Sequence, residues 1–177
     1  MSILVFNSGS SSLKFQLFDT PDQHQLQSLV RGKVSTFGEQ AACVWKMGDE
    51  VAHNMQRVIH HHQQAAEWII LHLHELDLVR SITAVGHRIV HGGDEFSVPV
   101  QLTDAVINTL ELLSPLAPLH SPLALQVIHA SRCFFAGTLP QIAVFDTAFF
   151  HGLSDPARYY ALPEQWTRDY GIKRYGF

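Results

Sequence analysis

The first nineteen residues constrain the fold most strongly. Two apolar segments, residues 3–6 and 13–19, flank the polar run Asn7–Ser12, whose sequence is NSGSSS. β-rich segments joined by Gly, Ser and Asn predict a hairpin with a tight turn. Such a turn gathers backbone N–H groups and hydroxyls, and with Lys14 just beyond it the loop can bind a phosphate. A Ser-rich turn without a ligand is the alternative. A Walker A loop is excluded, because G-x-x-x-x-G-K-[ST] is absent and a strand follows.

The hydrophobic pattern predicts an α/β domain built on a mixed sheet. Strands are expected over residues 2–7, 13–19, 26–35, 41–47, 82–85 and 141–145. Helices are expected over 58–78, over 104–113 with Thr103 as N-cap, from Pro122 to Gly137 with Ser121 as N-cap, and over 163–170. Hairpin strands followed by alternating helices and strands indicate a sheet that is antiparallel at its start and flanked by helices. The pattern breaks after Phe150, which predicts a domain over residues 1–150.

Composition excludes several classes of protein. Twelve Lys and Arg against sixteen Asp and Glu give a net charge of −4, so no basic stripe favours nucleic acid as a partner. The apolar run 3–6 is far too short to cross a bilayer, so no membrane partner is expected. Cys43 and Cys133 lack the spacing of a zinc site, which indicates buried free thiols in a reducing compartment and a cytoplasmic protein.

The segment Gly86–Gly93, GHRIVHGG, follows a predicted strand, where α/β proteins place ligands. Arg88 offers a planar fork that suits a carboxylate or a phosphate. His87 and His91 are four residues apart, which would favour a metal on a helix, but the local pattern is strand and turn. An ordinary surface loop is the alternative for this segment.

Two further polar residues lie where chemistry is possible. Asp146 ends an apolar strand, and a simple helix cap is its alternative role. His120 lies between two prolines, as a packed structural residue or as a donor to developing negative charge. The histidines at 60, 61, 62, 72 and 74 form no chelating pair along the predicted helix and are expected on a solvated face.

Taken together, the motifs resemble the acetate kinase family. The resemblance rests on NSGSSSLKF at 7–15, GHRIVHGG at 86–93, SPLAPLHSP at 114–122, AVFDTAF at 143–149 and YGIKRYGF at 170–177, in the order of the family. It implies the actin-like fold of sugar kinases and heat-shock-70 ATPases, in which two ribonuclease-H-like domains close on ATP. It also implies reversible phosphorylation of acetate to acetyl phosphate by ATP with Mg²⁺, or with Mn²⁺, in a homodimer.

The resemblance also implies roles for individual residues. Asn7 would help to position the metal and the phosphate, and Arg88 would hold the acetate carboxylate and the transferring phosphoryl group. His120 would donate to phosphoryl oxygens, and Asp146 would lie in the catalytic centre. The remaining residues fall into two sets: Ser10, Ser12 and Lys14 would contact the ATP phosphates, and Val90, Leu119 and Phe177 would form the pocket for the acetate methyl group.

Members of the family continue beyond the Gly-Phe at 176–177 into a second, nucleotide-binding domain. The resemblance therefore implies that residues 151–177 connect to that domain and that this chain alone is inactive. Propionate or butyrate kinase of the same family is one alternative, because one methylene in an apolar pocket is worth only about 1–3 kcal/mol. A carboxylate- or phosphate-binding module without catalysis is the alternative from a different class.

Overall fold

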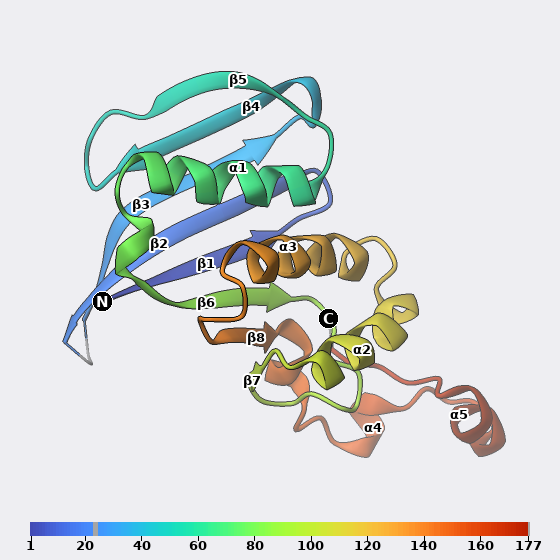
Figure 1. Ribbon diagram of the computed structural model, residues 1–177. Helices are drawn as coiled ribbons and strands as arrows, with labels where there is room; N and C mark the ends of the chain where they lie inside the picture. Colours follow the sequence, from blue (N-terminus) through green and yellow to red (C-terminus); the bar gives the residue numbers. More distant parts are fainter. Residues whose placement is uncertain (23–24, 177) are drawn as a thin grey trace.

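A computed structural model describes residues 1–22 and 25–176 (Figure 1). The described residues form a mixed sheet in the order β5-β4-β3-β2-β1-β6-β8-β7. Its strands are β1 (Ser2–Ser8), β2 (Ser12–Asp22), β3 (Gln25–Ser35), β4 (Gly38–Met47), β5 (His53–Ile59), β6 (Ile82–Ile89), β7 (Val100–Gln101) and β8 (Gln141–Phe145). The helices are α1 (His62–Glu75), α2 (Asp104–Leu113), α3 (Ser121–Phe134), α4 (Asp155–Arg158) and α5 (Glu164–Tyr170), with 3₁₀ turns at Val79–Ser81, Ser114–Leu116 and Asp146–Phe150.

Strand β1 joins the two halves of the sheet. It pairs antiparallel with β2, and β2 to β5 continue as an antiparallel meander. On its other side β1 pairs parallel with β6, which pairs parallel with β8, and the short strand β7 closes that edge in the antiparallel sense. The prediction of an α/β fold with a mixed sheet, antiparallel at its start, is therefore confirmed.

The main core lies between the sheet and helices α1 and α3, which cover one face of it (Figure 1). Alternate residues of β1, including Leu4 and Phe6, point into this core, as the period of two requires. Helix α1 contributes Ala65, Ala66, Ile69, Ile70 and Leu73, which are fully buried. Burying one large aliphatic side chain stabilises a fold by about 1.5–3 kcal/mol, so this face anchors both helices firmly.

A second cluster packs under β6, β8 and α2. It contains Ile89, Ile107, Leu110, Ile128 and Phe145, and the ring of Phe96 stacks on that of Phe145 with centroids 5.1 Å apart. This cluster supports the ends of β6 and β8, the two strands that carry the polar residues singled out in the sequence. No helix in the described part of the chain is long and apolar enough to cross a membrane.

Several predicted boundaries are wrong. Val58 and Ile59 belong to β5, which pairs with β4, and the helix begins only at His62. Two adjacent apolar residues fit a strand and a helix equally well, so periodicity alone could not separate them. The strand predicted over 82–85 continues to Ile89. Strand β7 and helix α4 were not predicted, because elements of two and four residues carry almost no periodic signal.

Helix α3 also differs from its prediction. Its N-cap is His120, so Ser121 is already the first helical residue. The helix ends at Phe134 rather than at Gly137, and Ala136 and Gly137 follow with positive φ angles. Helix α5 agrees closely with its prediction, beginning after Pro163 and ending at Gly171 in the left-handed conformation.

The expected solvated face is correct for His60, His61 and His74, which are exposed, but wrong for two other histidines. His62 is buried under Phe37, and the His72 ring packs against the rings of Trp45 and Trp68. Phe37, in the turn between β3 and β4, and Trp45, in β4, are distant from these histidines in the sequence, and local periodicity does not reveal such partners. Both cysteines are free, as expected, but only Cys43 is buried and Cys133 is exposed.

Gly32 provides a test of the packing between the sheet and α1. It lies between Phe15 and Trp45 in the register, and an added Cβ would come within 2.5 Å of the Phe15 ring and 2.6 Å of the Val44 carbonyl oxygen. We expect Gly32→Ala to lower the free energy of unfolding by about 1–3 kcal/mol, measured by urea denaturation. Gly152→Ala is the control, since a Cβ there meets no atom within 4 Å. Equal stability of the two variants would contradict this account.

Candidate active site

Three polar side chains meet at the carboxyl ends of neighbouring parallel strands. Asn7 lies near the end of β1, Arg88 near the end of β6, and Asp146 directly after β8. The register places Asn7 opposite Arg88 and Arg88 opposite Val144, two residues before Asp146. Side chains two residues apart on a strand share a face, so the topology brings all three together. This edge is where open α/β sheets bind ligands.

The guanidinium of Arg88 connects the three strands. Its Nε donates to Asp146 Oδ1 at 2.9 Å and its Nη2 to Asp146 Oδ2 at 2.5 Å, while Nη1 donates to Asn7 Oδ1 at 2.9 Å. Asp146 is 19% exposed and Arg88 37% exposed, so water reaches only one side of the cluster. A two-pronged bond to a carboxylate fixes the plane of the guanidinium. Three of its five N–H donors are used in this way, and no hydrogen bond to a described residue uses the other two.

The Ser-rich turn lies beside this cluster. The Gly9 N–H donates to the Ser12 carbonyl at 2.8 Å, which closes the predicted hairpin between β1 and β2, and Ser10 is exposed. Lys14 is exposed and lies directly opposite Asn7 in the register. Directly opposite residues share a face of the sheet, so Lys14, Asn7 and Arg88 point to the same side.

The other residues proposed from the resemblance are less closely assembled. His120 is the N-cap of α3, whose first turn lies toward the carboxyl end of β6 (Figure 1), but no hydrogen bond among the described residues joins it to Arg88 or Asp146. Val90 is buried just after β6, whereas Leu119 is 73% exposed. Phe177 lies outside the described residues.

Steric contacts and backbone conformation explain two of the three glycines of GHRIVHGG, Gly92 and Gly93. A Cβ on Gly92 would lie 2.5 Å from the Phe96 carbonyl oxygen and 3.0 Å from the Phe145 ring, and Gly93 has a φ of 61°. The Gly92 N–H also donates to Thr147 Oγ1 at 3.0 Å. This bond ties the loop after β6 to the turn that carries Asp146. Thr147 was not identified from the sequence, although it adjoins Asp146 in the AVFDTAF motif.

His87, next to Arg88, supports the site from inside the core. It is 3% exposed, its Nε2–H donates to Gln141 Oε1 at 2.9 Å, and Ser131 Oγ approaches the same oxygen at 2.7 Å. These contacts connect β6, β8 and α3 directly beneath the cluster. Burial lowers the pKa of His87 to about 4, against a weaker opposing effect of the Gln141 hydrogen bond. The ring is therefore neutral at pH 7.

Nothing in the described part of the chain supports a metal at His87 and His91. No three His, Cys, Asp or Glu side chains of those residues are grouped as ligands. The side chains at the cluster instead offer oxygen ligands, one carboxylate from Asp146 and one amide from Asn7. That set fits Mg²⁺, which keeps several waters and binds through one or two carboxylates together with substrate phosphates.

The last described residues return to this side of the molecule. Lys173 Nζ donates to Asp94 Oδ2 at 2.5 Å, and the Tyr175 ring packs edge-on against His91, with centroids 4.4 Å apart. Burial lowers the pKa of His91, and the nearby Asp94 partly opposes this. The loop after β6 is therefore held from both sides, by Thr147 and by residues 173–175.

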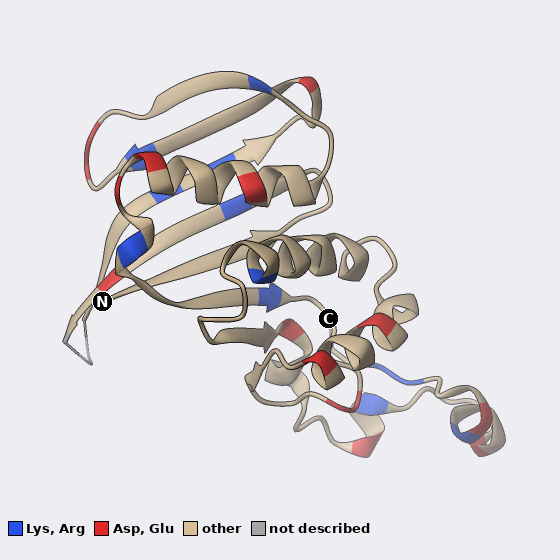
Figure 2. Cartoon of the chain, in the orientation of Figure 1, with Lys and Arg blue, Asp and Glu red and all other residues tan. Residues whose placement is uncertain are grey.

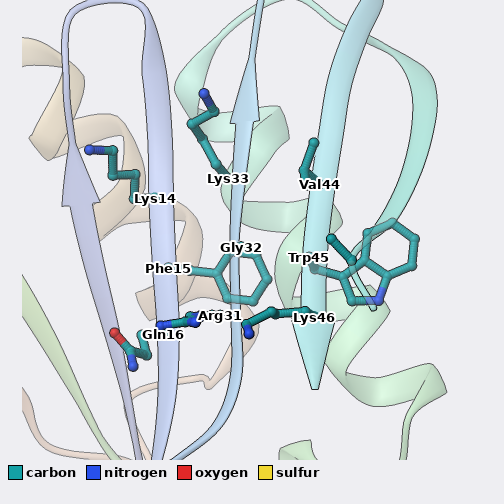
Figure 3. A pocket seen from close by; sticks show the side chains of 10 residues that line it. Lys14, Phe15, Gln16, Arg31, Gly32, Lys33, Val44, Trp45 and Lys46 are labelled. Atoms are coloured by element: carbon teal, nitrogen blue, oxygen red, sulfur yellow. The ribbon is translucent and has the colours of Figure 1, made fainter. Parts of the chain in front are cut away.

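A separate pocket of about 540 Å³ lies over β2, β3 and β4 (Figure 3). Lys14, Arg31, Lys33 and Lys46 line it, and these strands carry a concentration of positive charge (Figure 2). Lys14 is opposite Lys33 and Arg31 is opposite Lys46 in the register. None of the four forms an ion pair with a described residue. Among the described residues that line this pocket, Lys14 is the one directly opposite Asn7 of the Arg88 cluster.

This fold and site define a class of α/β protein in which a guanidinium is held at the carboxyl ends of parallel strands, beside a Ser-rich turn, an arrangement that suits an anionic ligand. The chain belongs to the acetokinase family, whose model matches residues 2–177. It is 41% identical to the acetate kinase of Shewanella amazonensis over 98% of this chain, and 38% identical to that of Thermotoga maritima over the whole chain. It spans 43% and 44% of those two relatives.

Solved structures agree with this assignment. An acetate kinase from Porphyromonas gingivalis matches with a TM-score of 0.89 and 35% identity, over 99% of this chain and 45% of that one. A propionate kinase from Francisella tularensis matches with a TM-score of 0.88 and 34% identity, over 99% of this chain and 44% of that one. The α/β fold expected for this part of the family is thus confirmed, and the chain spans less than half the length of these relatives.

A double-mutant cycle tests the Arg88–Asp146 contact. From urea denaturation of Arg88→Gln, Asp146→Asn and the double variant, we expect a coupling free energy of about 1–3 kcal/mol, because the contact is two-pronged and partly buried. The control pair is Arg132 and Asp104, whose bond of 2.7 Å involves a carboxylate that is 88% exposed. Its coupling should stay below about 1 kcal/mol. Equal coupling free energies for the Arg88–Asp146 and Arg132–Asp104 pairs would contradict the claim that Asp146 holds the guanidinium of Arg88 in place.

The buried His87 makes stability depend on pH. The unfolded chain protonates this residue below about pH 6.5, while the folded protein resists until about pH 4. The free energy of unfolding should therefore fall as pH drops from 6.5 to 4, by about 3 kcal/mol from this group. Urea denaturation across that range measures it, and His87→Gln should show a shallower slope. His74→Gln is the control, because His74 is exposed. If His87→Gln had the same pH slope as the unchanged protein, burial of His87 would not be the cause of the lost stability.

Proposed function

We propose that this chain is the N-terminal part of an acetate kinase, which transfers a phosphoryl group reversibly between ATP and acetate. The observation that carries the proposal is the guanidinium of Arg88, held by both oxygens of Asp146 and by Asn7 at the carboxyl edge of β1, β6 and β8. A fixed planar fork beside a turn rich in N–H and hydroxyl donors suits a carboxylate and a phosphoryl group bound side by side.

The chemistry requires positioning more than proton transfer. Acetate is a carboxylic acid with a pKa near that of Glu, about 4.3, so it is already ionised at pH 7 and needs no general base. The obstacle is the approach of one anion to the highly charged phosphates of ATP. Catalysis therefore depends on alignment and on neutralising charge, as in other phosphoryl transfers.

Each residue of the site has a role in aligning the two anions or in reducing the repulsion between them. Arg88 holds the acetate carboxylate and neutralises the transferring phosphoryl group. Asp146 accepts two bonds from Arg88, which supports its role as the group that orients the guanidinium rather than as a base. His120 donates to phosphoryl oxygens from the start of α3. Lys14, Ser10 and Ser12 contact the ATP phosphates from the turn.

Asn7 and Asp146 would hold Mg²⁺ through their side-chain oxygens, directly or through water, and the ion would neutralise phosphate charge when bound. Mn²⁺ accepts the same oxygen ligands and would substitute for it. Because Asn7 and Asp146 also bond to Arg88, the protein holds its cation-binding oxygens and its guanidinium in one network.

The methyl group of acetate would lie against Val90, Leu119 and Phe177. Propionate is the second candidate substrate, favoured by the similarity to the propionate kinase of Francisella tularensis. The exposure of Leu119 is compatible with either acid. One methylene changes binding by only about 1–3 kcal/mol in such a pocket.

We further propose that residues 1–150 form the first domain and that residues 151–177 lead to a second, nucleotide-binding one. The relatives, of which this chain spans less than half, supply the reason. The complete protein would work as a homodimer in the cytoplasm. The 177 residues alone would form no acetyl phosphate, because half of the nucleotide cleft would be missing.

The test is a turnover assay on the complete gene product with MgATP and acetate, detecting acetyl phosphate by hydroxylamine trapping. We expect Arg88→Lys to lower kcat/KM about a thousandfold, because an ammonium cannot reproduce the fork that stabilises the transferring group. Arg132→Lys, at an exposed ion pair, should change it less than about twofold.

The acid substrate is identified in the same assay by comparing kcat/KM for acetate, propionate and butyrate. No acetyl phosphate, or full activity of Arg88→Lys, would refute the proposed function. Full activity and unchanged magnesium dependence in Asp146→Asn would refute the role given to that carboxylate.

A further inference from the structure

His62 is a buried polar residue whose role is not explained by packing of the apolar core. It is the first residue of α1 and is 2% exposed, with its ring 4.6 Å from that of Phe37. Its Nε2 lies 2.7 Å from the carbonyl oxygen of Gly9, in the Ser-rich turn. A carbonyl oxygen only accepts, so Nε2 carries the proton and donates. The bond thus joins α1 to the turn across 53 residues of sequence.

The surroundings of His62 keep this donor in place. His61 caps α1 by accepting from the Gln64 N–H, and Gln64 Oε1 accepts from the His60 N–H at 2.8 Å. The three consecutive histidines are therefore ordered by the start of the helix. Burial is the main cause that lowers the pKa of His62, outweighing the hydrogen bonds to the Gly9 and Ser12 carbonyls, and the neighbouring His61 lowers it further.

The bond also determines where a neighbouring donor points. The Gly9 carbonyl and the Ser10 N–H belong to one peptide unit, which is trans because the described chain has no cis peptide bond. In a planar trans peptide the C=O and N–H point in opposite directions. Since His62 draws the Gly9 carbonyl toward α1, the Ser10 N–H points away from α1. No hydrogen bond among the described residues uses that N–H.

We propose that His62 is a positioning residue of the phosphate-binding turn: by holding the Gly9 carbonyl, it aims the Ser10 N–H at the phosphate of the substrate. This inference rests on the proposed function for the identity of the ligand, MgATP. The direction of the peptide unit follows from the contacts alone. His62 touches neither substrate nor metal, and it acts only through the backbone of the turn.

The test compares two substitutions at this position in the complete gene product. Gln places an amide donor where Nε2 lies, whereas Met keeps the apolar bulk and removes the donor. His72→Met is the matched control. His72 is also on α1 and packs against the rings of Trp45 and Trp68, but its side chain makes no hydrogen bond to the turn.

The first measurement is hydrogen exchange of a peptide that covers residues 8–12, which needs no substrate. We expect His62→Met to speed exchange about tenfold, because the turn opens more often once the buried bond to Gly9 is lost, His62→Gln less than about threefold, and His72→Met not at all. The second is steady-state kinetics, in which His62→Met should raise KM for MgATP about tenfold and leave KM for acetate unchanged. His62→Gln should restore most of the KM for MgATP.

Equal effects of Met and Gln would overturn the inference, because only one of them lacks the donor. Faster exchange with an unchanged KM for MgATP would also overturn it, since the turn would then be ordered without serving the phosphate. If the unchanged protein shows no turnover, the proposed function fails on its own. Direct titration of each variant with inorganic phosphate then decides the inference, and weaker binding by His62→Met alone would support it.

Discussion

The contact on which the rest of the site depends is the three-way bond of Arg88 to Asp146 and Asn7. It holds together three parallel strands, β1, β6 and β8, at their carboxyl ends. Two further hydrogen bonds support it. The His87–Gln141 bond joins β6 to β8 inside the core, and the Gly92–Thr147 bond joins the loops that follow these strands. A guanidinium held in this way needs no reorganisation when an anion arrives, which is the condition for efficient stabilisation of charge.

Much of the fold and the centre of the site could be predicted from the sequence, for a physical reason. The β1–β2 turn, Arg88 and Asp146 belong to local patterns, a polar turn between apolar runs and polar residues at strand ends, and the parallel topology brings such ends together. What could not be predicted depends on contacts between distant segments. Val58 and Ile59 lie in β5, which pairs with β4, while His62 packs against Phe37 and His72 packs against Trp45.

On the face of the sheet opposite α1, cationic side chains that could attract an anion also repel one another. Lys14 faces the Arg88 cluster on one side and Lys33 on the other, and Arg31 faces Lys46, so two pairs of like charges stand directly opposite. Such pairs destabilise a sheet by a few tenths of a kcal/mol up to about 1 kcal/mol each. The core beneath, with Ile69, Ile70 and Leu73, offsets this easily. These four cationic side chains lie on the same face of the sheet as Asn7, where their charge would favour the approach of anions.

The position of β1 between an antiparallel and a parallel neighbour has a consequence for the order of folding. The hairpin with β2 closes a short loop, whereas Asn7 reaches Arg88 across 81 residues and Arg88 reaches Asp146 across 58. Contacts of long sequence separation form slowly, because the entropy of closing the loop must be lost before they stabilise anything. We therefore expect the Ser-rich turn to form early and its guanidinium partner to join it only when the parallel half of the sheet is complete. A partly folded chain would then hold the turn without Arg88, so binding of an anion at the proposed site would report that folding has finished.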